Sequence, residues 1–430
     1  MKKYIQFSYL ISIGLFCAIY GCSPQSDVIT DIHKTDVSKI CRVEIKPSHL
    51  MLIADGKATM NLTPIVYIKE GDNEVRLPDS RIKDEWFQYT SSHSTLNIGR
   101  KFSTSDASLI GKTINVKVSV MGTNLQSDEA TFTIIKGVET EAYNEIVFPV
   151  VFHVLRENRE EEITGLTYDK ELFYNILQKM NNTFSGVNSK NPVGVDTRIR
   201  FKPAIYAPTG EKLMEPGINR VTINKLEDPE GDVVRNNLIW SPEQYLNIWL
   251  VSTLRDNSPS FLFRFLWRCQ PAYKYPHATN VPQGIELSDY SGNEPYSIYN
   301  AGIMYKLQDV GIISHTYSTY YGYVPGVNEL VHYVGYYLGL LQNNIFQKPM
   351  PGEDYCDDTI GYYSSKEFYL KNETSYKETP ECFFLSENIM DDPTGFHNSI
   401  SAEQNKRMRW FIENCPERSA WKSTFAFTGK

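Results

Sequence analysis

Side chains able to bind a metal ion or transfer a proton lie close together in the stretch from Pro325 to Gln342. It contains one histidine, His332, whose imidazole can bind a metal ion or transfer a proton near neutral pH. Tyr333 follows directly, and Tyr336 stands where a helix would bring it back to the face of His332. The stretch therefore offers one imidazole and two phenols, and their use depends on the element that positions them.

The pattern of this stretch predicts one helix and its exit. Pro325 suits the first helical position, where its missing N–H is not needed. Gly339 can adopt the left-handed conformation that ends many helices. The apolar residues recur at helical spacing and form one stripe: Leu330, Val334, Leu338 and Leu341. His332, Tyr336 and Gly339 then lie along another face.

Here the chain resembles the pappalysin-like metzincins, a family of secreted zinc endopeptidases whose helix reads H-E-x-x-H-x-x-G-x-x-H. In that motif three histidines hold the zinc, the glycine turns the chain, and the glutamate activates a zinc-bound water. The register that matches best keeps these family-like residues: Gly335, Tyr337, Leu338, Gly339, Leu340 and Leu341. His332 then stands at the first ligand position and Tyr333 at the general base. Tyr336 and Gln342 stand at the other two ligand positions.

A shifted register is the alternative, and it keeps the glutamate instead. The motif positions then fall on Asn328, Glu329, His332, Gly335 and Leu338. Glu329 would be the general base, and His332 would be the second ligand. The first register is preferred because it leaves more helix between Pro325 and the first ligand position. Either register offers a single imidazole, so the resemblance implies a degenerate zinc motif.

The loss of ligands would weaken zinc binding severely. A structural zinc site contributes on the order of 10 to 16 kcal/mol, so each of four ligands carries roughly 3 kcal/mol. Deprotonating Tyr336 at pH 7 would cost about 4 kcal/mol, and losing the general base would lower the rate by about 10²- to 10⁴-fold. His315 and His397 are the histidines placed to substitute, although an ordinary structural role is the more frequent one. We expect no cofactor, and zinc only if the domain is an active protease.

Segments on both sides of this helix also match the family in order and spacing. Residues 354–359 resemble the acidic loop that follows the zinc helix, and residues 388–391 resemble the Met-turn, with Met390 beneath the metal. The family's final helix is matched by Ser401, Gln404, Arg407 and Met408. Upstream landmarks are 148–154, 217–220 and 245–249. The resemblance therefore covers about 146 to 425 and implies a metzincin-like domain over 146–430.

Periodicity predicts the class of the same domain. Ile146–Val154 reads as a fully buried strand, and Glu171–Phe184 carries apolar residues at helical spacing. Tyr245–Val251 and Gly302–Tyr305 look like further strands. Strand, helix, strand and strand in this order indicate an α/β or α+β layer domain.

Residues 41–137 have a different, strand-like pattern. Its clearest example is the alternation of apolar and polar residues through Ile114, Val116, Val118 and Val120. Similar runs occur at 43–45, 60–68 and 131–135, separated by glycine-containing turns. This pattern predicts an all-β, immunoglobulin-like sandwich. We assign it a spacer role and no chemistry.

Residues 1–22 read as a bacterial lipoprotein signal peptide. Two lysines precede an apolar run that ends in Gly21-Cys22, which resembles a lipobox. Cys22 would then begin the mature chain and carry the lipid, and the polar stretch 23–40 would be a flexible tether. An uncleaved membrane helix is less favoured, because the run falls short of the roughly 20 residues that a span needs. We expect an outer-membrane lipoprotein that faces the periplasm or the cell surface.

An exported chain can form disulfides. Setting aside Cys17 and Cys22 leaves an odd number of cysteines: Cys41, Cys269, Cys356, Cys382 and Cys415. The favoured bridge joins Cys356 to Cys382, because both flank the loop that precedes Met390. At least one thiol must stay unpaired.

The net charge of −8 argues against nucleic acid as a partner, because no stretch supplies a clustered excess of Lys and Arg. The leading prediction is a membrane-anchored pseudoprotease that binds an extracellular protein, peptide or glycan. Nearby tyrosines could stack on peptides or sugar rings: Tyr317, Tyr320, Tyr321 and Tyr323. Two alternatives stay open: an active zinc-dependent metalloendopeptidase with an atypical site, and a structural component of the cell surface.

Overall fold

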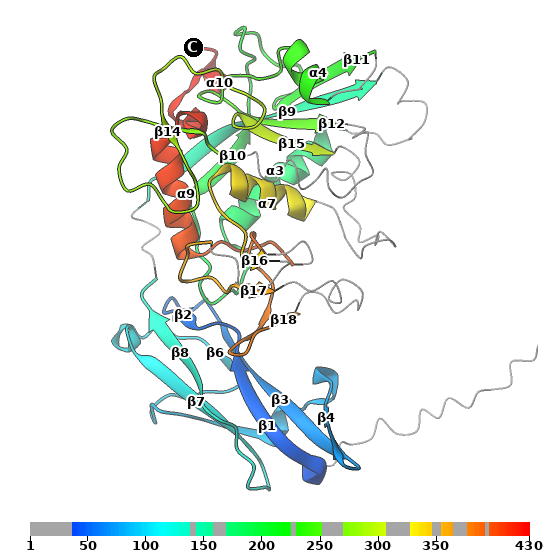
Figure 1. The fold of residues 1–430 in the computed structure, drawn as a ribbon, viewed down its shortest axis with the longest axis vertical. Helices are drawn as coiled ribbons and strands as arrows, with labels where there is room; N and C mark the ends of the chain where they lie inside the picture. Colours follow the sequence, from blue (N-terminus) through cyan, green and yellow to red (C-terminus); the bar gives the residue numbers. More distant parts are fainter. Residues whose placement is uncertain are drawn as a thin grey trace, which may run out of the picture. The chain divides into compact units, whose positions relative to one another are not determined.

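The computed structural model describes residues 37–137, 143–157, 169–224, 229–251, 270–306, 327–345, 354–363, 376–391 and 395–430. The described chain is a mixed α/β protein (Figure 1). It divides into two compact units. One takes in the chain up to Glu44 with Pro64–Gln88 and Val118–Ser127, and the other takes in Ile45–Thr63, Tyr89–Lys117 and Asp128–Lys430.

The first part of the chain is all strand and short 3-10 turns. The strands are β1 (Ile40–Pro47), β2 (Met51–Ile53), β3 (Met60–Glu70), β4 (Asn73–Arg76), β5 (Phe87–Ser91), β6 (Lys101–Phe102), β7 (Thr113–Val120) and β8 (Ala130–Ile135). One sheet has the order β1-β3-β4 with β6 on β3, and the other has the order β2-β8-β7-β5. Residues of β7 alternate between buried and half-buried, as predicted. The immunoglobulin-like arrangement and the domain boundaries stay predictions.

The second part is built on a five-stranded parallel sheet. Its strands are β9 (Ile146–Glu157), β10 (Ile199–Pro203), β11 (Ile218–Ile223), β12 (Leu246–Val251) and β15 (Gly302–Lys306). β9 is central: its first half pairs with β10, its second half pairs with β11, and its other edge pairs with β12. β15 lies beyond β12, also parallel. The strands predicted at 146–154, 245–251 and 302–305 are confirmed.

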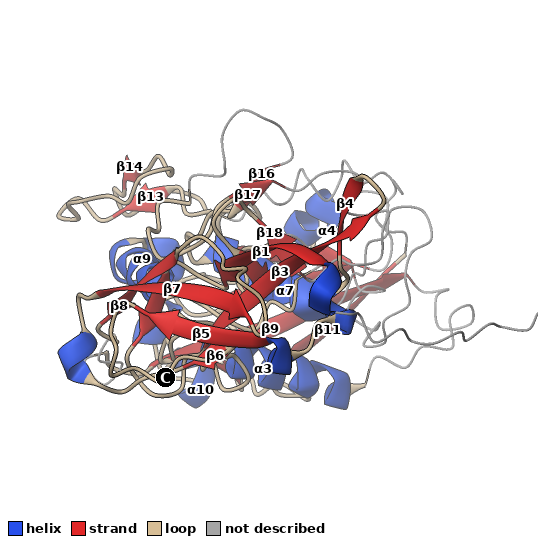
Figure 2. Cartoon of the chain, turned by 90° about the horizontal axis from the view of Figure 1, so that it is seen from below, coloured by secondary structure: helices blue, strands red, loops and turns tan. Residues whose placement is uncertain are grey.

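The second part also contains helices, which Figure 2 draws in blue among the red strands. They are α3 (Lys170–Phe184), α4 (Pro229–Arg235), α7 (Val327–Tyr337), α9 (Ala402–Asn414) and α10 (Phe425–Thr428). Short two- and three-residue strands complete the fold: β13 (Tyr273–Lys274), β14 (Ser288–Asp289), β16 (Asn344–Ile345), β17 (Tyr362–Tyr363), β18 (Tyr376–Glu378) and β19 (Phe383–Leu385). The 3-10 turns are η1 (Val37–Lys39), η2 (Asp79–Arg81), η3 (Asp84–Trp86), η4 (Ala107–Leu109), η6 (Pro416–Arg418) and η7 (Ala420–Lys422).

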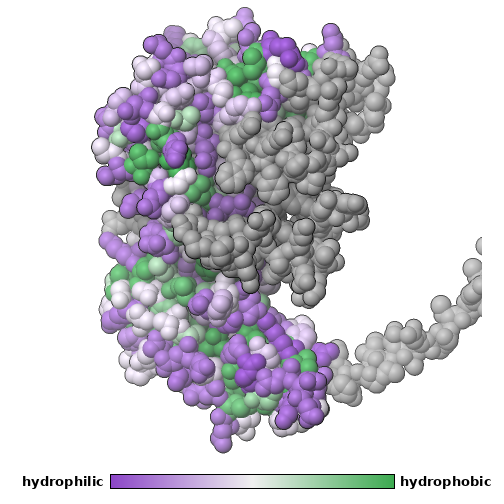
Figure 3. Space-filling model, in the orientation of Figure 1, coloured by the Kyte–Doolittle hydropathy of each residue, from purple (hydrophilic) through white to green (hydrophobic). Residues whose placement is uncertain are grey.

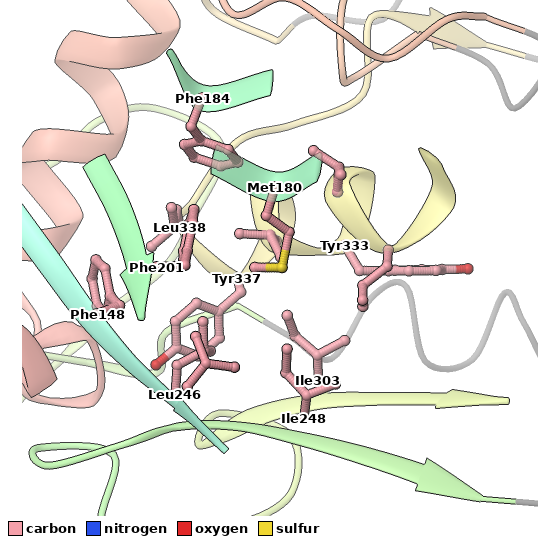
Figure 4. Close-up of a cluster of buried hydrophobic side chains, with 14 of the residues drawn as sticks. Phe148, Met180, Phe184, Phe201, Leu246, Ile248, Ile303, Tyr333, Tyr337 and Leu338 are labelled. Carbon is pink, nitrogen blue, oxygen red and sulfur yellow. The ribbon is translucent and has the colours of Figure 1, made fainter. Parts of the chain in front are cut away.

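Both faces of the sheet are buried, which explains why β9 reads as a continuous apolar run. Phe148 and Phe152 point to the side covered by α3, α7 and α9, where they join the largest hydrophobic cluster (Figure 4). Val151 and Leu155 point to the opposite side, toward residues of α10 and α4. The predicted strand is therefore buried on both faces, and α7 rests directly on the sheet.

The surface offers little that marks a docking face. On the face drawn in Figure 3, hydrophilic residues predominate and hydrophobic ones are scattered. Exposed large side chains such as Met121, Val187 and Met214 come from separate segments, as is ordinary on protein surfaces. Among the residues that the structure describes, no helix has the length and hydrophobicity that crossing a bilayer requires.

Candidate functional site

Gly339 ends α7, and both its backbone conformation and its close neighbours require a glycine at this position. Gly339 has a φ of 89°, and its N–H donates to the Tyr336 carbonyl at 2.9 Å while that of Leu340 donates to the Gly335 carbonyl at 3.0 Å. These two bonds are the Schellman pattern. A Cβ at position 339 would lie 2.2 Å from Phe411. The predicted left-handed cap is confirmed.

Side chains from the last segment satisfy the carbonyls at this helix end. Arg407 Nε donates to the Gly339 carbonyl at 2.7 Å, and Arg418 Nε donates to the Tyr337 carbonyl. The Tyr337 hydroxyl in turn donates a hydrogen bond to the Glu417 carbonyl at 2.7 Å. Cations at a helix C-terminus also interact favourably with the helix dipole. Sequence patterns had placed Arg407 on the final helix but gave no sign of the role of Arg418.

Residues 388–391, where the resemblance places a Met-turn, form a tight turn that packs against α7. Met390 N–H donates to Asn388 Oδ1 at 2.9 Å, and the Asp391 N–H donates to the Asn388 carbonyl at 3.1 Å. The Met390 sulfur lies 2.6 Å from where a Cβ on Gly335 would be. The close approach explains why position 335 carries no side chain.

His332 is buried, with 5% of its surface exposed. Its Nδ1–H donates to the carbonyl of Ile389, the residue before Met390, at 2.5 Å. The bond assigns the proton to Nδ1 and leaves Nε2 as the nitrogen with a lone pair. Metal-ligating histidines commonly hold their other nitrogen in this way, but so do satisfied core histidines. The turn at 388–391 therefore orients the ring of His332.

The three positions of the first register come together. The rings of His332 and Tyr336 meet edge to face at 4.8 Å between centroids, with an interplanar angle of 88°. The Tyr336 hydroxyl donates to Gln342 Oε1 at 3.2 Å. A phenol and an amide thus face each other beside the imidazole, where the resemblance places the second and third ligands.

Tyr333, at the general-base position of the first register, has its ring centroid 6.0 Å from that of His332, at an interplanar angle of 79°. It is buried and packs on Tyr305 of β15, with ring centroids 5.6 Å apart. In Figure 4 it stands at the edge of the hydrophobic cluster, near Ile303. Glu329 belongs to α7, but its side chain lies outside the described residues. So do His315, Cys22 and the tyrosines at 317, 320, 321 and 323.

One of the two candidate substitute histidines lies beside His332. The ring of His397 stacks on that of His332 at 5.5 Å, with an interplanar angle of 21°. His397 is 1% exposed and has a φ of 46°, a left-handed conformation. Its carbonyl accepts a hydrogen bond from Thr183 Oγ1 at 3.4 Å. The residues after the turn at 388–391 thus bring a second imidazole to the site.

The other described histidines of this domain lie elsewhere. His153 is fully buried on β9, where Nε2 donates to Asn247 Oδ1 and Nδ1 accepts from Asn219 Nδ2, each at 3.0 Å. Burial lowers the pKa of this imidazole from 6.5 to about 4. His277 is exposed and stacks on Tyr275. Neither contributes to the surroundings of His332.

Among the described residues, the donors around His332 fall short of the set that a catalytic zinc ion takes. Such an ion takes three protein ligands with strong donors, typically histidine, carboxylate or thiolate. Within the described ranges, no three His, Cys, Asp or Glu side chains gather closely enough to hold a metal ion. In the described part of the chain, the His332 ring also contacts the phenols of Tyr333 and Tyr336, and Tyr336 bonds to the amide of Gln342.

The acidic loop at 354–359 helps to hold α9. Asp358 accepts bonds from Ser401 Oγ at 2.5 Å and from the Glu403 N–H at 2.9 Å, beside the capping box of Ser401 and Gln404. Asp354 accepts from the Cys356 N–H and from Thr359 Oγ1. Burial raises the pKa of both aspartates to about 6. The loop has a structural role among the described residues.

The predicted bridge between Cys356 and Cys382 does not form in this structure. Both thiols are free and buried, but they have different surroundings. Cys356 Sγ donates to the Asp354 carbonyl at 3.6 Å, whereas Cys382 packs with Tyr362 and Phe384. Burial raises the pKa of the Cys382 thiol to about 12 and raises that of Cys356 further. Cys269 lies outside the described residues.

Solved structures that resemble the chain include those of mirolysin. Mature mirolysin from Tannerella forsythia, in complex with a cleaved peptide, is 22% identical over 66% of this chain and 97% of its own, with a TM-score of 0.42. Mirolysin in complex with a compound is 20% identical over 66% and 98%, with a TM-score of 0.41. A promirolysin mutant from Tannerella forsythia is 19% identical over 67% and 87%, with a TM-score of 0.37. No protein-family model and no curated protein matches the sequence.

Proposed function

We propose that residues 146–430 form a metzincin-like scaffold that does not hydrolyse peptide bonds and that binds an extracellular protein, peptide or glycan. We further propose that lipid on Cys22 anchors it to the outer membrane, facing the periplasm or the cell surface. The motif order from the helix at 325–342 to the final helix supports the first proposal. The lysines, apolar run and Gly21-Cys22 of the leader support the second.

The hydrogen bond from Tyr336 to Gln342 carries the proposal of lost catalysis. In the first register these residues replace two of three zinc-binding histidines. Their side chains bond to each other, and the His332 ring packs against Tyr336. A zinc ion would have to break this bond and also deprotonate the phenol. Tyr336 and Gln342 therefore occupy the two ligand positions with an uncharged hydrogen bond.

An active zinc endopeptidase is the second candidate, and His397 is the observation that favours it. Two buried imidazoles lie 5.5 Å apart by their ring centroids, and the tautomer of His332 leaves Nε2 able to accept. This pair would still lack a third strong ligand among the described residues. We therefore rank the catalytic role second.

Metal content separates the two candidates. The detergent-solubilised full chain is incubated with zinc, dialysed and measured by elemental analysis. We expect far less than one zinc per chain and no cleavage of a peptide library. About one zinc per chain that disappears in the variant His332→Ala, together with cleavage, would overturn the proposal.

A gain-of-binding variant tests the register itself. Tyr336→His combined with Gln342→His supplies both missing ligands, which strengthens zinc binding by about 10⁴-fold at roughly 3 kcal/mol per ligand. The matched control adds His332→Ala, which should remove the new binding. A folded double variant that takes up no zinc would show that positions 332, 336 and 342 do not form one site.

A further inference from the structure

A hollow lies on the solvent side of α3, and none of the residues that line it is His332, Tyr336 or Gln342. It has a volume of about 310 Å³, at the lower end of the roughly 300–1,000 Å³ that small-molecule sites occupy. Its walls come from α3, the following loop and the loop after the turn at 388–391. The lining residues are all polar: Asn175, Gln178, Lys179, Asn182, Thr183, Asn188 and Asn398.

The helix periodicity explains how amide side chains reach one wall. α3 buries Phe173, Ile176, Leu177, Met180 and Phe184 against the sheet. Asn175, Gln178 and Asn182 recur at spacings of three and four residues, so they share another face of the helix. Asn188 follows Gly186, whose φ of 63° turns the chain. Asn398 follows His397, which is also left-handed.

The amides of this hollow have hydrogen-bonding capacity to spare. Within the described part of the chain, the side chains of Asn175, Gln178, Asn182 and Asn188 make no hydrogen bond to another residue. Asn398 Nδ2 donates to Glu387 Oε1 at 3.4 Å, but its buried Oδ1 has no donor. A buried acceptor without a donor is unfavourable. A ligand hydroxyl would supply that donor.

We propose that this hollow binds a neutral oligosaccharide. Each amide presents a donor and an acceptor side by side, which matches the paired hydroxyl groups of a sugar ring. The lining carries no carboxylate, and its single cation, Lys179, already interacts with another residue, so the amides are the groups that meet the ligand and they suit an uncharged one. None of its lining residues is a hydrophobic one of the kind that holds peptide side chains. The volume admits about one or two sugar residues.

The inference rests on the proposed binding function, for which it names a ligand class, but it concerns a different site. The hollow shares no lining residue with the group of His332, Tyr336 and Gln342. The result of the zinc measurements therefore does not decide whether this hollow binds a sugar. Sugar binding could equally fail while the domain proves non-catalytic.

The test uses the detergent-solubilised full chain on an array of neutral and acidic oligosaccharides. A neutral oligosaccharide that is retained is then titrated by calorimetry. Gln178→Ala and Asn182→Ala should each weaken its binding by about two- to tenfold, the usual effect of a lost hydrogen bond. Gln88→Ala removes an exposed amide on β5 and should leave the affinity unchanged. Equal melting temperatures would confirm that the variants fold.

Four outcomes would overturn the proposal. One is that no oligosaccharide on the array is retained. A second is that binding occurs but is unchanged in both α3 variants. A third is that only acidic oligosaccharides bind. The fourth is that the hollow binds peptides, shown by peptide affinity that falls in Gln178→Ala. The isosteric change Gln178→Glu removes the N–H donors and should weaken a neutral sugar about as much as Gln178→Ala.

Discussion

Acidification should destabilise the second domain through the neutral imidazole of His153. The ring is enclosed on β9 by Trp240 and Trp249, at centroid distances of 4.8 and 6.2 Å. Nε2 of His153 bonds to Asn247, and Nδ1 accepts from Asn219. Protonation of Nδ1 would place an N–H against the N–H of Asn219, so two donors would face each other. The folded state therefore resists protonation, whereas the unfolded chain accepts it readily.

The pKa of His153 fixes the size and sign of the effect. Burial lowers it to about 4, against 6.5 for the free side chain. Between these values the unfolded chain binds more protons, so stability is complete above pH 6.5 and is lost as the pH falls toward 4. The difference corresponds to about 3 kcal/mol, at about 1.4 kcal/mol for each tenfold change in the equilibrium.

Other groups titrate in the same pH range, so the assay has to compare the stability of the wild type with that of a variant that lacks the imidazole. Asp354 and Asp358 have raised pKa values of about 6, and their contribution to stability falls as the pH rises from 4 to 6. Urea unfolding of the wild type and of His153→Gln, followed by tryptophan fluorescence, is therefore compared at pH 7 and pH 4. The variant should be less stable at pH 7, where it loses the packing of the ring. This deficit should shrink by about 3 kcal/mol at pH 4.

Parallel stability curves would refute the reasoning. If the difference between wild type and His153→Gln stays constant from pH 7 to pH 4, the imidazole is not held neutral. His49 gives an independent check, because its buried ring also has a pKa lowered to about 4. His49→Gln should show a shift of the same sign, and the two effects should add because the residues lie on separate elements.

Two further changes test the contacts around α7. Gly335→Ala places a methyl group 2.6 Å from the Met390 sulfur and should lower the free energy of unfolding by about 1–3 kcal/mol through overpacking. Gly99→Ala, with open space around it, is the control, and equal denaturation midpoints would contradict the packing. Arg418→Met removes a fully buried cation beside Glu417 and should cost about 3–5 kcal/mol. The exposed change Lys422→Met should cost little, and a similar loss in both variants would count against the special role of Arg418.

Much of the second domain could be predicted because its signals are local. The apolar run of β9 and the helical spacing of α3 depend on which faces are buried, and both faces of β9 are covered. Gly339 was recognisable because a helix exit needs a left-handed residue. The pairing of β10 and β11 on the same edge of β9 had no local signal, since parallel partners are distant in sequence.

The site could be predicted only in part. The register placed His332, Tyr336 and Gln342 together because helix geometry and the glycine turn fix their spacing. The position of His397 depends on a left-handed backbone and a contact with Thr183, which no periodicity reveals. The disulfide expectation between Cys356 and Cys382 was wrong, because flanking the same loop does not make two side chains meet. Arg418 was missed because an isolated arginine looks like a surface residue.

The hydrogen bonds from Arg407 and Arg418 to the C-terminal end of α7 have a consequence for the order of folding. The carbonyl of Tyr337 accepts from a group 81 residues later in the chain, and that of Gly339 from a group 68 residues later. Contacts this distant form late, since the intervening chain must first close a loop. During synthesis the helix that carries His332 would emerge well before its partners. The candidate site should therefore mature at the end of folding, and until then its apolar residues remain open to chaperones and proteases.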